Sequence, residues 1–341
     1  MFDNLNSRIG FACKYMHHDQ YLPKKELENI QRAYNGKTAT ITNLRKLTRK
    51  EAYDKIKEIV VFNMTCYENL ISYVAKLPYN QKMLRLGSDL LPGYTHTEFC
   101  EFYDIPEMVD LIGNKLSYIG ELSREYDIRL SMHPGQYVSV ASENPEIVNN
   151  ALLDLEYHAY IAKEMGYGKE FQDFKINVHL SGKKGISGFL SIYPKFSEHL
   201  RNMLTLENDE YVCGIDDLLP LADKVPIVLD IHHHWIKYDE YIKPNDNRIE
   251  LIKKSWRGVK PVIHYSYSSE EVFPVDFKHD KLYSLNELLD LGLKRNKLRA
   301  HSSMYPNNHA NMWALSHLSW ADIMCEAKSK NLASSQLAEL V

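Results

Sequence analysis

Six carboxylate or imidazole side chains stand at equivalent places in the sequence, each at the end of a short apolar run or directly after it. They are His133, His179, Glu207, Asp230, His264 and Glu326. Mixed imidazole and carboxylate donors bind Zn²⁺ or Mn²⁺, and scattered cysteines without a CxxC motif argue against a closed structural zinc site. One such histidine alone is more often a structural polar residue. Six in equivalent places predict a site for several divalent ions, in which one carboxylate bridges two ions roughly 3.5–4 Å apart, the spacing that suits phosphate ester hydrolysis.

Eight short apolar runs supply the strands that must position these groups. They cover residues 8–13, 83–87, 128–132, 175–180, 203–207, 226–230, 261–265 and 322–326. Helix-length connections separate most of them, as parallel neighbours in a sheet require. Eight such units predict an α/β fold of the TIM (β/α)₈ barrel type. The six side chains end the third to the eighth strand, where barrels of this type carry their catalytic groups.

The chain shows neither repeats nor a linker rich in proline or glycine, so one domain is the economical interpretation. We expect this domain to cover residues 1–330, with residues 331–341 as a C-terminal tail. The connections 14–46 and 266–321 are long for a barrel. We expect them to carry inserted loops over the face that bears the strand ends.

Composition limits the classes of function. The 341 residues carry a formal net charge of −4, so a nucleic-acid binder of this charge must use local basic patches. The five cysteines are odd in number and scattered, which is typical of reduced thiols in an intracellular protein. The N-terminus lacks the pattern of a signal peptide, and no apolar run approaches the roughly 20 residues that span a bilayer. We expect an intracellular protein of cytoplasm, nucleoid or nucleus, acting as a monomer and away from membranes.

Seven segments of the chain resemble the UV damage endonucleases, a family related to the endonuclease IV barrels. The resembling segments are Ile9-Gly10-Phe11, Arg85-Leu86-Gly87, Leu130 to Tyr137, Leu206-Glu207-Asn208-Asp209, Leu229 to His233, Trp256-Arg257-Gly258 together with His264, and Glu326-Ala327-Lys328. The run Ser-Met-His-Pro-Gly-Gln-Tyr at 131–137 is highly specific, whereas an isolated Arg-Leu-Gly is not. The resemblance extends over about residues 8–330.

The resemblance implies a full set of metal ligands. By position, they are His133, His179, Glu207, Asp230, His233, His264, His301 and Glu326. His233 is new relative to the strand-end argument. His301 lies in the long connection before the last strand and on its own fits either a further ligand or a loop histidine. The resemblance also makes Glu207 the bridging carboxylate, and it implies two or three divalent ions, Mn²⁺ before Zn²⁺ or Mg²⁺.

The implied substrate is double-stranded DNA that contains UV lesions. The family nicks the damaged strand immediately 5′ to the photoproduct and leaves a 3′-hydroxyl. The pair that probes the duplex at the lesion falls on Gln136 and Tyr137, which follow a Pro-Gly turn. On its own, Tyr137 is more typical of a core aromatic residue.

Contacts to the DNA backbone need cations near the strand ends. The candidates are Lys183, Lys184, Lys294, Arg295, Lys297 and Arg299. Charge runs are usually solvated faces, but these follow the fourth strand or precede His301, where phosphates would lie. Lys328 follows Glu326 by two residues and fits either a catalytic contact to the phosphate or a solvated loop lysine.

Three positions depart from the family pattern. Val262 stands where the family has a lysine two residues before the histidine of the seventh strand. Residues two apart on a strand share a face, so we expect Val262 to point into the barrel below His264, where it neither ligates nor donates. Phe11 and Tyr15 replace a tyrosine and an asparagine near the first strand, which weakens the expected hydrogen bonding on the lesion side.

Two other functions remain open at this point. A sugar isomerase or epimerase of the same architecture also uses Glu, Asp and His around two metal ions. It would, however, present a small closed pocket and no pair of side chains that enters a DNA duplex. A non-catalytic barrel that binds damaged DNA is the other alternative, and the departure at Val262 raises its weight.

Overall fold

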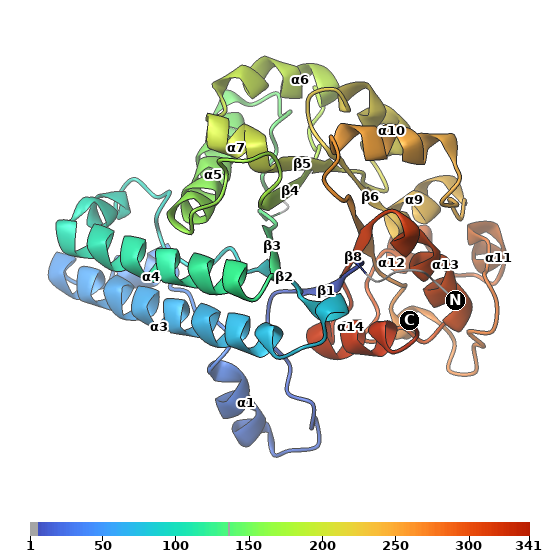
Figure 1. Cartoon of the computed structure of the whole chain (residues 1–341), viewed down its shortest axis with the longest axis horizontal. Helices are drawn as coiled ribbons and strands as arrows, with labels where there is room; N and C mark the ends of the chain where they lie inside the picture. The colour runs from blue at the N-terminus through green and yellow to red at the C-terminus, as the bar shows by residue number, and fades with distance from the viewer. Residues whose placement is uncertain (1–5, 136) are drawn as a thin grey trace.

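A computed structural model describes residues 6–135 and 137–341 and shows eight parallel strands closed into a barrel (Figure 1). The strands are β1 (Ile9–Ala12), β2 (Met83–Leu86), β3 (Arg129–Met132), β4 (Lys175–His179), β5 (Leu204–Glu207), β6 (Ile227–Asp230), β7 (Val262–Tyr265) and β8 (Asp322–Cys325). They pair in chain order, and β8 returns to pair with β1. The predicted TIM barrel is confirmed, and every strand boundary lies within one residue of its prediction.

Helices surround the barrel between successive strands (Figure 1). They are α1 (Lys24–Arg32), α2 (Ile41–Leu44), α3 (Arg49–Ala75), α4 (Pro106–Glu125), α5 (Pro145–Glu164), α6 (Gly185–Ile192), α7 (Glu198–Met203), α8 (Ile215–Leu218), α9 (Ile231–Tyr238), α10 (Asn247–Ser255), α11 (Leu285–Asp290), α12 (Arg295–Leu298), α13 (Asn308–Ser316) and α14 (Lys330–Ala338). Short 3₁₀ helices η1 (Tyr79–Gln81), η2 (Cys100–Asp104), η3 (Tyr193–Lys195), η4 (Leu219–Leu221), η5 (Glu270–Val272) and η6 (His317–Ser319) fill further connections.

The helix starts follow ordinary capping chemistry. Thr48 begins α3 with a complete capping box, in which its side chain accepts from the Glu51 amide and the Glu51 carboxylate accepts from the Thr48 amide. Asn144 caps α5 directly before Pro145 in the first turn. These local signals fix where each helix begins, and they leave the strands free to pair in order.

The barrel interior is polar below its mouth. Side chains alternate along a strand, so Ile176 and Val178 of β4 pack toward the helices while Lys175, Asn177 and His179 share the inner face. Lys175 and Asn177 are both buried. Such buried polar groups are stable only when they are paired, which ties the interior to the residues at the mouth.

The two long connections carry extra helices. Residues 14–46 hold α1 and α2, and α1 projects from the body of the barrel (Figure 1). Residues 266–321 hold α11, α12 and α13, and their Phe273 and Leu285 form a second apolar cluster with Trp235 of α9. An isolated antiparallel bridge between Ser268 and His301 folds this connection back on itself.

The C-terminal segment is structured. Residues 331–341, which the sequence suggested to be a tail, lie largely in α14, whose Ala333 and Leu337 are buried. Helix α14 packs against β1, so it belongs to the helical layer of the barrel. All five cysteines are free thiols. Within residues 6–135 and 137–341, no helix has both the length and the apolar character needed to cross a bilayer.

Candidate metal centre

The structure brings the six strand-end side chains together at the carboxyl end of the barrel. One group contains His133, His179 and Glu207; the other contains Glu207, Asp230, His264 and Glu326. Within each group, one ligand atom from every residue lies within 4.8 Å of all the others. The parallel strands end at one rim, so side chains far apart in the sequence meet there.

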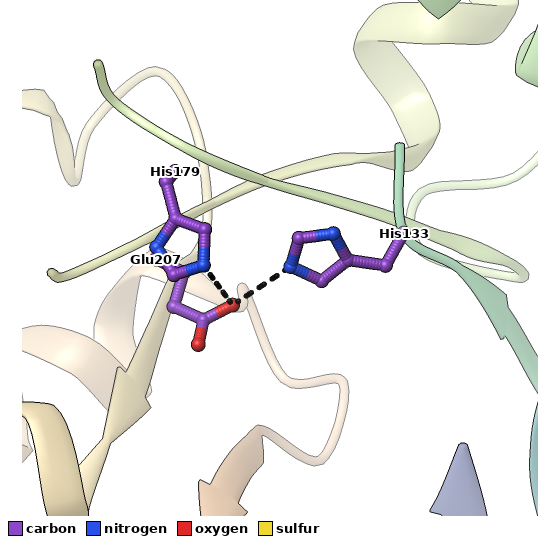
Figure 2. Close-up of side chains that lie close together, drawn as sticks. All are labelled: His133, His179 and Glu207. Atoms are coloured by element: carbon purple, nitrogen blue, oxygen red, sulfur yellow. Dashed lines mark ion pairs between the residues drawn. The ribbon is translucent and has the colours of Figure 1, made fainter. Parts of the chain in front are cut away.

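Glu207, at the end of β5, belongs to both groups. Its Oε2 lies 3.4 Å from Nε2 of His133 and 3.8 Å from Nε2 of His179 (Figure 2). Its Oε1 lies 3.0 Å from Nδ1 of His264. The two carboxylate oxygens therefore face different groups, Oε2 the first and Oε1 the second. This is the arrangement of a carboxylate that bridges two cations.

The barrel interior holds Glu207 in place. Asn177 donates to its Oε2, and Asn177 in turn accepts a hydrogen bond of 2.7 Å from the Thr205 hydroxyl. Burial favours the neutral acid, but the charges of His264 and His179, with the hydrogen bond from His264, hold the pKa of Glu207 well below its usual range. The carboxylate is thus ionised and positioned to attract cations.

The second group contains a carboxylate oxygen that lacks a partner. Asp230 uses Oδ1 to cap α9, accepting from the His233 amide at 2.7 Å. Its Oδ2 is buried and accepts no hydrogen bond from the described residues. Burial raises the pKa of this carboxyl to about 6. An uncompensated oxygen beside Glu326 and His264 fits a divalent cation, which would offset the cost of its burial.

Three histidines present one ring nitrogen to this region in the same way. His133 Nδ1 donates to the Pro134 carbonyl at 2.8 Å, His233 Nδ1 to the Asn208 carbonyl at 3.2 Å, and His301 Nδ1 to the Glu326 carbonyl at 2.9 Å. In the neutral ring, a proton at Nδ1 leaves the lone pair at Nε2, which is the nitrogen that can bind a cation. Histidine ligands of metals are commonly oriented by such a bond to a carbonyl.

His233 and His301 lie beside the two groups rather than in them. His233 sits in the first turn of α9, and its ring centroid is 5.5 Å from that of His179 and 6.5 Å from that of His301. Among the described residues, neither histidine joins a group whose ligand atoms are all within 4.8 Å. The structure thus places both at the rim, in a looser arrangement than the six strand-end residues.

The residues predicted to probe the lesion are only partly described. Gln136 lies outside the described residues. Tyr137 follows it on the loop after β3, and 73% of its surface is exposed. This exposure contrasts with the core position that its residue type alone suggests. It places an exposed aromatic ring on the same loop as His133.

The predicted backbone cations lie on the surface, but several have protein partners. Lys183 pairs with Glu143 at 3.2 Å, and Arg295 donates to the Lys237 carbonyl at 3.1 Å. Arg299 forms an ion pair with Glu210. The exposed members whose side chains have neither an ion pair nor a hydrogen bond in the described chain are Lys184, Lys294 and Lys297. Lys328 is also exposed and donates to the Ser269 hydroxyl at 3.3 Å.

Lys175 is a residue that the sequence analysis missed. It begins β4, is only 3% exposed, and brings Nζ to 2.9 Å from Nε2 of His264. Burial lowers the pKa of its ammonium group to about 7. Val262 is buried as predicted. A lysine from β4 therefore approaches the histidine of β7, although β7 itself carries none at position 262.

Other contacts at the first strands differ from what the family pattern suggests. Arg85 of β2 forms an ion pair with Glu326, which places this arginine next to the second group. Phe11 is buried, and Tyr15 packs against Tyr34 with ring centroids 4.3 Å apart. The useful signal for Lys175 was its position on the same face of β4 as His179, whereas Arg85 lies on β2, which carries no ligand-type residue.

Comparisons with known proteins agree with this architecture. The family model described as UV-endonuclease UvdE matches residues 7–341. The UV DNA damage endonuclease of Bacillus cereus (strain G9842) is 28% identical over 314 residues, covering 89% of this chain and 88% of that protein. The UV-damage endonuclease of Schizosaccharomyces pombe is 27% identical over 293 residues, covering 79% of this chain and 45% of that protein.

A solved structure supports the fold independently. The crystal structure of SacUVDE superposes with a TM-score of 0.72 at 21% sequence identity, covering 98% of this chain and 97% of that chain. At this identity the likeness speaks for the barrel alone. Because the family model extends over almost the whole described chain, this protein belongs to the UV-endonuclease UvdE family.

Proposed function

We propose that this protein is a DNA-repair endonuclease that nicks the damaged strand immediately 5′ to a UV photoproduct and leaves a 3′-hydroxyl. The observation that carries the proposal is the position of Glu207, with one carboxylate oxygen facing each donor group at the barrel mouth. Paired divalent sites of this kind suit phosphodiester hydrolysis. Membership in the UvdE family supports UV-damaged double-stranded DNA as the substrate.

Each donor group would hold one divalent ion. His133, His179 and Glu207 would bind the first, and Glu207, Asp230, His264 and Glu326 the second. His233 and His301 would take part in a third site at the rim. Imidazole and carboxylate donors suit Mn²⁺, which we propose as the native ion ahead of Zn²⁺ or Mg²⁺. When bound, such ions supply a water nucleophile at neutral pH and stabilise negative charge on the phosphate.

The chain's own residues orient the substrate around this centre. Lys328, two residues after Glu326, would leave Ser269 and contact the phosphate that is cut. The exposed cations Lys184, Lys294 and Lys297, with Lys183, Arg295 and Arg299 once their protein partners release them, would follow the DNA backbone. These contacts position the duplex without reading its sequence.

Lesion recognition would come from the loop after β3. A photoproduct stacks poorly, so unstacking and bending the duplex there costs less than in intact DNA. The exposed ring of Tyr137, with Gln136 before it, would enter the space at the lesion. This loop also carries His133, so a duplex opened by Gln136 and Tyr137 would lie against the metal centre. The protein would act as an intracellular monomer.

Incision of a defined duplex tests the proposal. An end-labelled duplex with one UV photoproduct is incubated with the protein and Mn²⁺, and the undamaged duplex serves as control. We expect one cut 5′ to the lesion and a fragment that a DNA polymerase extends, because its end is a 3′-hydroxyl. Lesion-dependent binding without a cut would indicate a damage sensor. The absence of both would favour the sugar isomerase instead.

A further inference from the structure

Glu210 is a buried carboxylate that the proposed function does not use. It lies on the loop after β5, three residues beyond Glu207, and only 2% of its side chain is exposed. Together with His133, His179 and His233, it lines a cleft of about 190 Å³ at the barrel mouth. Burying a carboxylate is costly unless hydrogen bonds or a cation compensate its charge.

The protein compensates this charge only in part. Arg299 Nε lies 2.5 Å from Oε1 of Glu210 and forms an ion pair with it, but Oε1 accepts no hydrogen bond from the described residues. Oε2 lies 3.7 Å from Nε2 of His233, which is too long for a hydrogen bond. Glu210 is therefore held beside a histidine nitrogen without bonding to it. This arrangement leaves a place for a cation between the two side chains.

The same spacing occurs inside the metal centre. The Nε2–Oε2 distances from His133 and His179 to Glu207 are 3.4 and 3.8 Å, and the distance from His233 to Glu210 falls within this range. Two ligands that each lie roughly 2.0–2.2 Å from one ion are separated by about 3–3.5 Å. A shift of a few tenths of an ångström would bring His233 and Glu210 to that separation.

The ring orientations support the same conclusion. His233 and His301 each donate Nδ1–H to a backbone carbonyl, as His133 does, so Nε2 is the nitrogen that each ring can offer to a cation. We propose that Glu210 is a protein ligand of the third divalent ion, which it binds together with His233 and His301. The inference rests on the proposed function for the existence of that ion. It adds the carboxylate that two histidines alone would lack.

A different role for Glu210 must be separated from ligation. Arg299 contacts both Glu210 and the ring of Tyr211, whose centroid lies 4.9 Å from the guanidinium carbon. Glu210 would be only a positioning residue if its purpose were to hold Arg299 for DNA. In that case, removing Arg299 should weaken DNA binding as much as removing the Glu210 carboxylate does.

Counting bound Mn²⁺ separates the two roles. Wild type, Glu210→Gln and Arg299→Met are brought to equilibrium with Mn²⁺ by dialysis, and the ions per chain are measured by elemental analysis. We expect three ions in wild type, two in Glu210→Gln and three in Arg299→Met. Glu210→Asp keeps the charge but retracts the oxygens, so it should bind the third ion at least about tenfold more weakly. Circular dichroism checks that each variant is folded.

The remaining outcomes are distinct. Three ions in Glu210→Gln would overturn the inference, and so would the loss of one ion from Arg299→Met. Two ions in both wild type and Glu210→Gln would also overturn it, while leaving the centre around Glu207 intact. A wild-type protein without any bound Mn²⁺ would instead contradict the proposed function itself.

Discussion

The metal centre and its rim are built in different ways. Around Glu207, the side chains come from the ends of β3 to β8, and their ligand atoms lie within 4.8 Å of one another in two groups. At the rim, His233, His301 and Glu210 come from the start of a helix and from two loops, and their contacts are looser. Strands of a closed barrel hold side chains more exactly than loops do. We therefore expect the centre to serve the proposed chemical step and the rim to adjust around a bound phosphate.

The largest expected effect comes from removing the charge that both groups share. Glu207→Gln keeps the shape of the side chain but loses the anion that faces His133 and His264. We expect incision of the damaged duplex to fall by more than about a thousandfold, which corresponds to roughly 4 kcal/mol of transition-state stabilisation. Single-turnover nicking measures the rate, with Glu125→Gln on the surface of α4 as the matched control. Substantial residual nicking would show that Glu207 does not bridge the two groups.

A smaller effect should follow a change one layer below the centre. Lys175→Met keeps most of the length of the side chain but removes the contact to Nε2 of His264. Partners that orient a ligand typically contribute about 10–100-fold to metal affinity or activity, and we expect a loss in this range. Titration of incision with Mn²⁺ measures it.

A second variant tests whether incision depends on which strand supplies the amine. Adding Val262→Lys to Lys175→Met returns an amine to the interior from β7, and we expect partial recovery of incision. Wild-type activity in Lys175→Met alone would reduce Lys175 to a packing residue.

The exposed wedge should affect selectivity more than rate. Tyr137→Ala removes the aromatic ring from the loop after β3, and base–aromatic stacking contributes about 1–3 kcal/mol per base. We expect the preference for damaged over intact duplex to fall roughly tenfold, measured by competition binding with Glu207→Gln as the inactive background. Tyr211→Ala is the control, since Tyr211 is another exposed tyrosine at the mouth, with 51% of its surface exposed. If only Tyr211→Ala lowered the preference for damaged duplex, the side chain that enters the duplex would be Tyr211, on the loop after β5, and not Tyr137.

The smallest effect concerns the backbone cations at the rim. Lys294→Gln with Lys297→Gln should weaken binding and lower the slope of log K against log salt by about 1 to 2, since each phosphate contact contributes about 0.9. Fluorescence anisotropy at several salt concentrations measures the slope. Lys253→Gln with Lys254→Gln on α10 is the matched pair. An unchanged slope would remove Lys294 and Lys297 from the DNA footprint.

The sequence predicted the centre far better than the rim. Apolar runs located all eight strands, and the barrel architecture then required that His133, Glu207 and Asp230 meet at one end. Alternation of side chains along β7 predicted Val262 in the interior, and the residue is buried. These inferences needed only local patterns and a rule about where parallel strands end.

The surroundings of the residues that the sequence did not predict depend on contacts between distant parts of the chain. Lys175 reaches His264 from β4, and no spacing within one strand reveals which opposite strand a side chain approaches. The burial of Glu210 depends on how two loops fold over the mouth. Arg299 looked like a free DNA contact, because a run of cations says nothing about the carboxylate that one of them meets. Tertiary packing, rather than residue type, decided each of these positions.

Anomalous diffraction from crystals soaked with Mn²⁺ tests the central claim most directly. The account predicts two peaks that flank the Glu207 carboxylate, one beside His133 and His179 and the other beside Asp230 and His264. No peak at Glu207, or ions bound only elsewhere on the surface, would contradict it.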